Sequence, residues 1–164
     1  MKYVINELYS EILMKSCVEQ PHVLQLILAT NACLLAALYH LLGDDFLADF
    51  IRKFILVFRE NLPNEAQKGN NEQVSEGERS QVYKTRNVIL MFCFLYDFET
   101  LNEDFMQHIL LHIADNLNED TISYILTIIQ NSGFKIRQNS PGSIKVINFL
   151  ELMENNFLGH IRLY

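Results

Sequence analysis

The chain has 164 residues, of which 49% are hydrophobic and 20% are charged. This length and composition predict one globular domain with a buried core and exclude a chain that is disordered throughout. The formal net charge is −7 and the pI is about 5.2. Because tight binding to nucleic acid depends mainly on Lys and Arg displacing counterions, this balance argues against a domain whose main task is to neutralise phosphates.

The first part of the chain predicts three helices. Apolar residues recur at three- and four-residue spacing between residues 3 and 18. Pro21 then breaks the chain and begins an apolar helix over residues 22–42, which Gly43 ends. A third helix is predicted at residues 45–62, with its apolar side chains on one stripe. That stripe consists of Phe46, Leu47, Phe50, Ile51, Phe54, Ile55 and Phe58. Asp49 is spaced to pair with Lys53 on the solvent side.

The helix at residues 22–42 is apolar and long enough to resemble a membrane span. It carries Gln25, Thr30, Asn31 and His40, however, and no basic residues flank it closely. A helix that is apolar nearly all round is also what a layer covered on both sides requires. We therefore expect a buried core helix and no contact with a membrane.

Three cysteines, Cys17, Cys33 and Cys93, lie far apart inside apolar runs. Their odd number and wide spacing argue against a disulfide framework and against a Cys-x-x-Cys metal site. We expect small buried thiols in a reducing compartment. The first residues of the chain also lack the charged, apolar and small-residue order of a signal peptide.

Pro63 ends the third helix, and residues 63–80 are polar, with one Val and one Ala as their only apolar members. Such a segment cannot bury enough surface to offset its chain entropy, so we expect a flexible insertion. The alternatives are a binding tail or a phosphorylation site at Ser75 or Ser80.

Four further helices are predicted at residues 81–96, 102–116, 118–132 and 141–156. Thr100 and Glu103 have the spacing of a capping box at the start of the second of these. Asn118 opens the third, with acidic residues in its first turn, and Gly133 closes it. Pro141 suits the first turn of the last helix.

Seven helices and no convincing strand predict an all-α fold. The helices pair as short-linked hairpins, and their spacing is typical of a HEAT-like (ARM-type) helical-hairpin solenoid. We expect one helical-repeat domain over residues 1–157, with the flexible insertion at residues 63–80. Residues 158–164 would form a C-terminal tail or the start of a further helix.

Little in the chain predicts catalysis. His108 and His112 are spaced as in zinc peptidases, but Ile109 stands where those enzymes need Glu, so we expect an exposed helix face. The run from Lys145 to Phe149 fits a loose docking pattern for protein phosphatase one. That docking needs an extended strand, whereas this run falls in a predicted helix. No nucleophile motif or glycine-rich nucleotide loop is present. We expect neither an enzyme nor a bound cofactor, and no small-molecule substrate.

The notable basic residues of the second half are Lys84, Arg86, Lys135, Arg137 and Lys145. A solvated surface is one interpretation of this grouping. The other is a binding site, because Lys135 and Arg137 would follow a helix end, where solenoids commonly bind their partners.

The stretch from residue 87 to residue 141 has a distinctive sequence pattern. An apolar helix ends in Leu95-Tyr96-Asp97-Phe98, and a later helix ends in the run NSGFKIR, from Asn131 to Arg137. Upstream stands LLGDDFLADFIRKF. This sequence pattern resembles that of the middle domain of translation initiation factor 4G, most closely in the nucleolar branch of that family. The resemblance extends over about residues 1–152. That domain normally has helices before the position of Met1, so we expect this chain to lack its N-terminal part.

The resemblance implies a crescent of HEAT-like hairpins that binds a DEAD-box RNA helicase of the initiation-factor-4A type. Members hold the two RecA-like lobes in a defined relative orientation and so control lobe closure, which tunes ATP turnover and RNA release. For the nucleolar branch it further implies a nucleolar location in the nucleus and a role in small-subunit ribosomal RNA processing. RNA would be contacted mainly through the complex.

The predicted contacts with the partner are residues at loops and helix ends: Lys84, Arg86, Asn87, Asn131, Lys135 and Arg137. We expect Leu95, Tyr96, Phe98, Gly133 and Phe134 to hold the fold instead. Two alternatives remain open. One is an adaptor of the same fold in translation initiation, splicing or messenger decay, and the other is direct RNA binding through the surface from Lys84 to Lys145.

Overall fold

The structure is a computed structural model and describes residues 2–62, 76–115 and 117–139. These residues form six α-helices and one π-helical turn, and they contain no strand. The elements are α1 (Lys2–Leu13), η1 (Met14–Val18), α2 (Gln25–Leu42), α3 (Asp44–Asn61), α4 (Glu76–Asp97), α5 (Glu103–Ala114) and α6 (Glu119–Asn139). The all-α prediction is confirmed. The predicted seventh helix, at residues 141–156, and the docking pattern from Lys145 to Phe149 lie outside the described residues.

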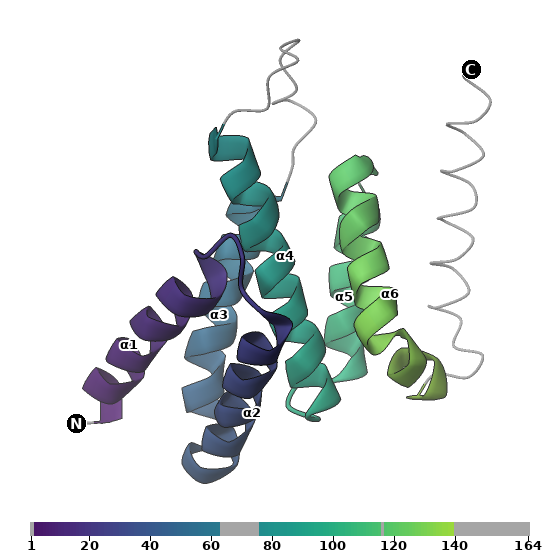
Figure 1. Ribbon diagram of the computed structural model, residues 1–164. Helices are drawn as coiled ribbons and strands as arrows, with labels where there is room; N and C mark the ends of the chain where they lie inside the picture. Colours follow the sequence, from purple (N-terminus) through teal and green to yellow (C-terminus); the bar gives the residue numbers. More distant parts are fainter. Residues whose placement is uncertain (1, 63–75, 116, 140–164) are drawn as a thin grey trace, which may run out of the picture.

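Helix α4 is the centre of the stack (Figure 1). It packs against α2 and α3 on one side and against α5 and α6 on the other. Two tertiary hydrogen bonds set its direction relative to α6: Tyr124 Oη donates to Val82 O at 3.3 Å, and Lys135 Nζ donates to Tyr96 O at 2.9 Å. Both helices therefore run the same way and pack directly on each other, and α5, which connects them in the chain, runs in the opposite direction, as in a stack of helical hairpins.

The apolar stripe predicted on α3 faces α4. The rings of Phe54 and Phe58 meet the edge of Phe92 at centroid distances of 6.2 and 6.4 Å. Phe92 in turn meets Phe105 of α5 at 5.1 Å. Edge-to-face rings add about 0.5–1.5 kcal/mol per pair to the burial of their area. These contacts join three helices into one core.

Several helix boundaries differ from the predictions. Helix α4 begins at Glu76, inside the segment predicted as a flexible insertion, while residues 63–75 lie outside the described residues. The N-cap of α5 is Asn102, whose Oδ1 accepts from Phe105 N at 2.9 Å, whereas Thr100 Oγ1 donates to Phe98 O. The capping-box prediction was wrong because Thr100 belongs to the turn that follows α4.

Gly133 does not close a helix, as the sequence predicted; α6 continues through it to Asn139. The buried residues of α6 repeat at three- and four-residue intervals across the glycine, at Ile125, Ile128, Ser132 and Ile136. Packing against α4 therefore carries the helix past a residue with a poor helix propensity. In contrast, Gly43 has φ of 90° and ends α2 as predicted.

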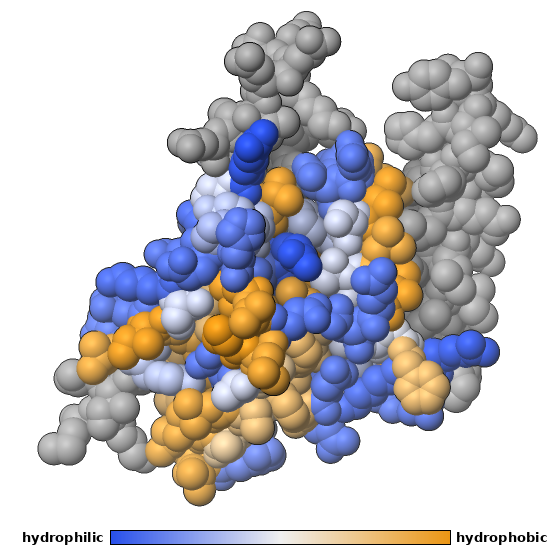
Figure 2. Space-filling view, viewed as in Figure 1, coloured by the Kyte–Doolittle hydropathy of each residue, from blue (hydrophilic) through white to orange (hydrophobic). Residues whose placement is uncertain are grey.

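Helix α2 is covered on one side only, which corrects the expectation of burial on both sides. It is long and apolar enough to cross a membrane, yet its buried residues are only Leu28, Ala32, Leu35 and Ala36. Cys33 is exposed on this helix, whereas Cys17 and Cys93 are buried as predicted. In Figure 2 an apolar surface extends over the region of α1 and α2.

Candidate partner-binding surface

The six residues predicted to contact a partner lie on the neighbouring helices α4 and α6 (Figure 1). Lys84, Arg86 and Asn87 lie near the middle of α4, while the others belong to the second half of α6. Since Tyr96 pairs with Lys135, an axial rise of 1.5 Å per residue places Lys84 about 18 Å from the Lys135 end. The structure therefore does not gather the six residues into one patch.

Asn87 is buried, with only 3% of its surface exposed. Its Nδ2 donates to Val18 O at 3.3 Å and to Gln20 O at 2.9 Å. The chain leaves the π-helical turn at these carbonyls, which have no helical N–H partner, so the amide supplies the donors that they need. Asn87 consequently holds η1 against α4 and presents no side chain to a partner.

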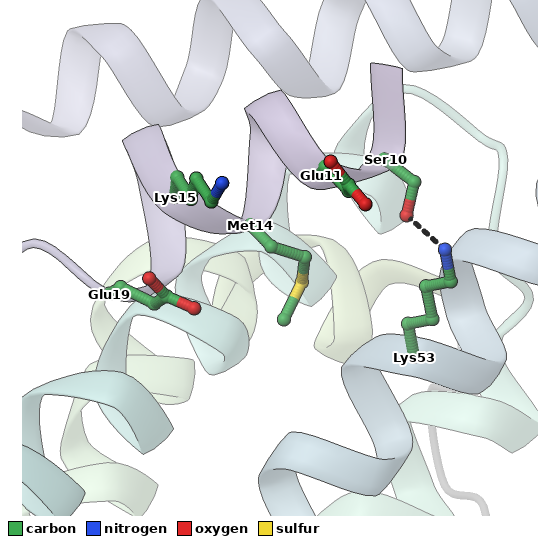
Figure 3. Close-up of a pocket in the computed structure, with 6 residues that line it drawn as sticks. All are labelled: Ser10, Glu11, Met14, Lys15, Glu19 and Lys53. Atoms are coloured by element: carbon green, nitrogen blue, oxygen red, sulfur yellow. Dashed lines mark hydrogen bonds between the residues drawn. The ribbon is translucent and has the colours of Figure 1, made fainter. Parts of the chain in front are cut away.

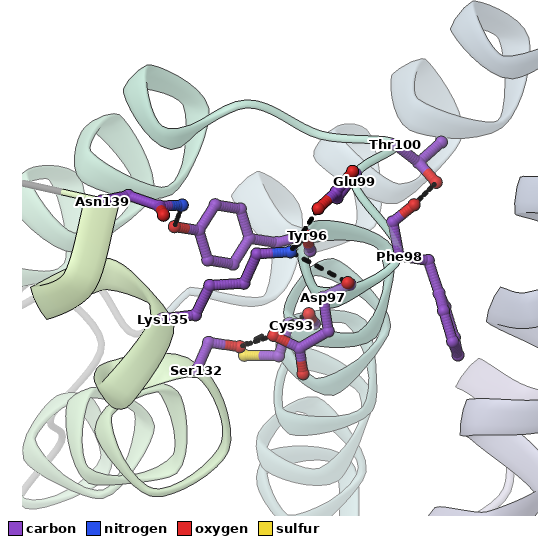
Figure 4. Close-up of polar contacts among 9 residues, drawn as sticks. All are labelled: Cys93, Tyr96, Asp97, Phe98, Glu99, Thr100, Ser132, Lys135 and Asn139. Carbon is purple, nitrogen blue, oxygen red and sulfur yellow. Dashed lines mark hydrogen bonds and ion pairs between the residues drawn. The ribbon is translucent and has the colours of Figure 1, made fainter.

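Lys135 lies in α6 rather than in a loop, and it caps the end of α4 (Figure 4). Its Nζ donates to Tyr96 O and Asp97 O, each at 2.9 Å, and lies 5.0 Å from the centroid of the Tyr96 ring. The Glu99 carboxylate is 3.9 Å away. A cation at the negative end of a helix satisfies the last carbonyls and complements the macrodipole. Lys135 therefore stabilises the fold.

The same cluster ties α6 to α4 at three further points (Figure 4). Ser132 Oγ lies within hydrogen-bond distance of Cys93 O and Asp97 Oδ1, at 3.4 and 3.3 Å, and Asn139 Nδ2 donates to Tyr96 Oη at 3.0 Å. Burial raises the pKa of the Cys93 thiol to about 12 and also raises the pKa of Asp97. A buried, protonated thiol is a poor nucleophile, so this cluster is structural.

The predicted residues that remain accessible are Arg86 and Arg137, which are exposed, and Lys84, which is half-buried. Asn131 is half-buried, and its Nδ2 donates to Thr127 O of the same helix. Accessible cationic side chains therefore lie near the middle of α4 and near the end of α6.

Phe134 is 75% exposed, although the sequence predicted it in the core. It lies three residues before Arg137, on the same side of α6. Exposed aromatic residues beside arginine are enriched at protein–protein contacts. The signal was present in the sequence: inward positions at residues 125, 128, 132 and 136 point residue 134 outward once the helix continues. Phe98, also predicted in the core, is exposed in the turn after α4.

The histidine pair does not build a metal site in the described part of the chain. His108 Nδ1 lies 2.6 Å from Asp104 O, and the ring of His112 packs 6.0 Å from that of Phe58. Among the described residues, no three His, Cys, Asp or Glu side chains are grouped so that they could hold a metal ion.

A shallow hollow of about 290 Å³ lies between α1, η1 and α3 (Figure 3). Across it Lys53 Nζ donates to Ser10 Oγ at 2.7 Å. Acidic and basic side chains alternate around it, and its lining consists of Ser10, Glu11, Met14, Lys15, Glu19 and Lys53. Asp49, which was predicted to pair with Lys53, forms an ion pair with Arg52 at 3.1 Å. No activated nucleophile or acid–base pair stands among the residues that line the hollow, so its chemistry is that of a solvated surface of mixed charge.

Comparison with known proteins gives one family and one relative. The family model described as the MIF4G domain matches residues 2–160. The protein described as nucleolar MIF4G domain-containing protein 1 homolog, from Drosophila melanogaster, is 23% identical over 146 residues. That match covers 89% of this chain but only 16% of the fly protein. No solved structure matches the chain significantly.

Proposed function

Because the chain belongs to the MIF4G domain family, we propose that it is a non-catalytic scaffold that binds and regulates a DEAD-box RNA helicase of the initiation-factor-4A type. The observation that carries this proposal is the family match over nearly the whole chain, on a stack of helical hairpins. The sequence patterns from Leu95 to Phe98 and from Asn131 to Arg137 predicted the same family, and the family match confirms that prediction. Stacks of this kind offer long surfaces of helix faces and ends to protein partners.

The proposed setting is the nucleolus, with small-subunit ribosomal RNA processing as the process. Support comes from the fly relative, whose name describes a nucleolar protein. This chain spans 16% of the length of that relative, so the process served by the whole relative reaches this chain only as a proposal.

The contact that we propose uses two separate groups on the α4–α6 pair. Lys84 and Arg86 lie near the middle of α4, on different sides of that helix, and Phe134 and Arg137 lie together near the end of α6. Their separation along the helices suits a partner held at two points, such as the two lobes of a helicase. By holding both lobes, the scaffold would bias their closure and so the turnover of ATP.

The direct test is binding of the purified chain to purified helicases of the initiation-factor-4A type by isothermal titration calorimetry, with RNA-stimulated ATPase as a second readout. We expect the double variants Lys84→Glu/Arg86→Glu and Phe134→Ser/Arg137→Glu each to weaken binding about tenfold or more, as loss of central contact residues does. The matched control is Arg59→Glu, which reverses an exposed cation on α3.

Two results would contradict the proposal. One is the absence of binding to any such helicase by the wild-type chain. The other is submicromolar binding of RNA alone, with a steep salt dependence that the Lys84→Glu/Arg86→Glu variant reduces, because that would assign this surface to nucleic acid. Equal loss in the Arg59→Glu control would show that only net charge matters.

A further inference from the structure

The turn after α4 contains a strained residue. Glu99 has φ of 58°, and it is the one residue other than glycine with a positive φ in the described part of the chain. In this left-handed region a side chain crowds its own backbone, so glycine is the residue best suited to it. At the other described position of this kind the chain has glycine, Gly43. Strained residues are concentrated at functional sites, which makes Glu99 a candidate contact residue.

Backbone hydrogen bonds at the end of α4 hold Glu99 in this conformation. Thr100 N donates to Leu95 O at 2.9 Å, and Glu99 N donates to Tyr96 O at 3.0 Å. These are the two bonds of a Schellman motif, in which the residue just past the helix end is left-handed and is usually glycine. The conformation is therefore set by the way α4 ends, and the glutamate side chain is not needed to produce it.

The carboxylate of Glu99 also contributes little to the fold. Its side chain is 86% exposed and lies 3.9 Å from Lys135 Nζ. An ion pair this exposed is weakened by water and adds little to stability. Lys135 is held in any case by its hydrogen bonds to Tyr96 O and Asp97 O (Figure 4). The strain at Glu99 is thus not offset by a buried contact of its own side chain.

We propose that Glu99 is a contact residue for the helicase and that its carboxylate binds a basic side chain of one helicase lobe; this inference rests on the proposed function. A carboxylate accepts two parallel hydrogen bonds from an arginine, and such charge-assisted pairs are the stronger ones. The chain has a net charge of −7, so its field attracts a basic surface.

The position of the turn agrees with this proposal. Because Lys135 of α6 binds the last carbonyls of α4, the turn lies at the same end of the α4–α6 pair as Phe134 and Arg137. Phe98, the residue before Glu99, is 39% exposed, and its ring points away from Lys135 (Figure 4). The turn therefore presents an apolar and an acidic group to solvent, next to the contact group already proposed on α6.

The test compares stability with binding in the same variants of the full chain. Glu99→Gly removes both the strain and the carboxylate, so we expect a higher urea midpoint together with weaker binding to purified helicases of the initiation-factor-4A type. Glu99→Gln keeps the strain and the shape but removes the charge. We expect it to unfold at the wild-type midpoint and to weaken binding about fivefold, with a smaller dependence of Kd on salt.

Asp115 provides the matched control. It is also an exposed acidic residue that follows a helix end, but its φ is −62°. Because glycine relieves no strain there and adds freedom to the unfolded chain, Asp115→Gly should lower the urea midpoint. Asp115→Asn removes one negative charge away from the proposed contact and should leave binding unchanged.

The outcomes separate this inference from the proposed function. Wild-type binding that Phe134→Ser/Arg137→Glu weakens and both Glu99 variants leave unchanged overturns the role of Glu99 and keeps the scaffold proposal. A wild-type chain that binds no such helicase overturns both. A urea midpoint of Glu99→Gly at or below that of wild type would show that the fold itself favours glutamate here, and equal weakening by Asp115→Asn would show that only net charge matters. Either result would refute the inference.

Discussion

The substitution Asn87→Asp tests whether Asn87 stabilises the fold or contacts a partner. The two side chains have nearly the same shape, but a carboxylate has no hydrogen to donate. In the native structure the Asn87 amide donates to Val18 O and Gln20 O. A carboxylate at this position would place a negative oxygen against two carbonyl oxygens. Two hydrogen bonds would thus be replaced by electrostatic repulsion, while the side chain would keep its shape.

The magnitude follows from two hydrogen bonds and one buried charge. Each bond contributes about 0.5–1.5 kcal/mol, so Asn87→Ala should lower the free energy of unfolding by about 1–3 kcal/mol. Asn87→Asp should lower it by about 3–5 kcal/mol, because the carboxylate is also removed from water without a donor. For a domain of this size, 1 kcal/mol corresponds to roughly 2–4 °C, so the larger loss lowers Tm by about 10 °C.

Urea unfolding at neutral pH, followed by circular dichroism, measures these values. Arg86→Ala is the neighbouring control, and we expect it to remain within about 0.5 kcal/mol of wild type because Arg86 is exposed. Acidification should recover part of the Asn87→Asp loss, since a protonated carboxyl regains one donor. The reasoning is refuted if Asn87→Asp unfolds with wild-type stability while helicase binding is lost.

Four further predictions concern stability and thiol chemistry. Gly133→Ala should stabilise the protein by about 0.5 kcal/mol in urea unfolding, because Gly133 lies inside a helix and the new methyl, 3.3 Å from Ile129 Cγ2, requires only a small shift of that half-exposed side chain; destabilisation would show that Ile129 does not yield. Lys135→Met should destabilise by about 1–2 kcal/mol through loss of the α4 cap, and an unchanged midpoint would deny that role. A thiol reagent at pH 8 should label Cys33 alone, and labelling of further thiols without denaturant would contradict their burial. Stability should fall above about pH 9, because burial raises the pKa of both Cys93 and Tyr9 to about 12, so the unfolded chain loses these protons first; a flat profile to pH 11 would oppose this.

Periodicity predicted the helices that form the core. The stripe on α3 and the apolar run after Val88 face their neighbours as expected, because burial of apolar area is the dominant favourable term in folding. Asn118 caps α6 as predicted: its Oδ1 accepts from Thr121 N at 3.0 Å. Helix caps of this kind depend on residues three apart, so they are visible in the sequence.

The errors arose where distant segments supply the partner. A polar residue at the edge of an apolar run reads as surface, yet Asn87 is buried because the carbonyls of Val18 and Gln20 meet it from a segment far away in the chain. A glycine reads as a helix end, yet α6 continues through Gly133 because α4 packs against it. From the sequence Lys135 was predicted to be a free cation, yet its Nζ donates to Tyr96 O at the end of α4.

The sequence alone determined the helical class, most of the hairpins and the family, since these depend on local spacing and on lettering within single helices. The tertiary structure decided which polar residues are accessible and which side of α2 is covered. Local patterns specify how many apolar faces a helix has, but they do not specify which neighbour covers each face. For α2 one face meets α3 and α4, and the other is exposed in the described part of the chain because no helix of the stack packs over it.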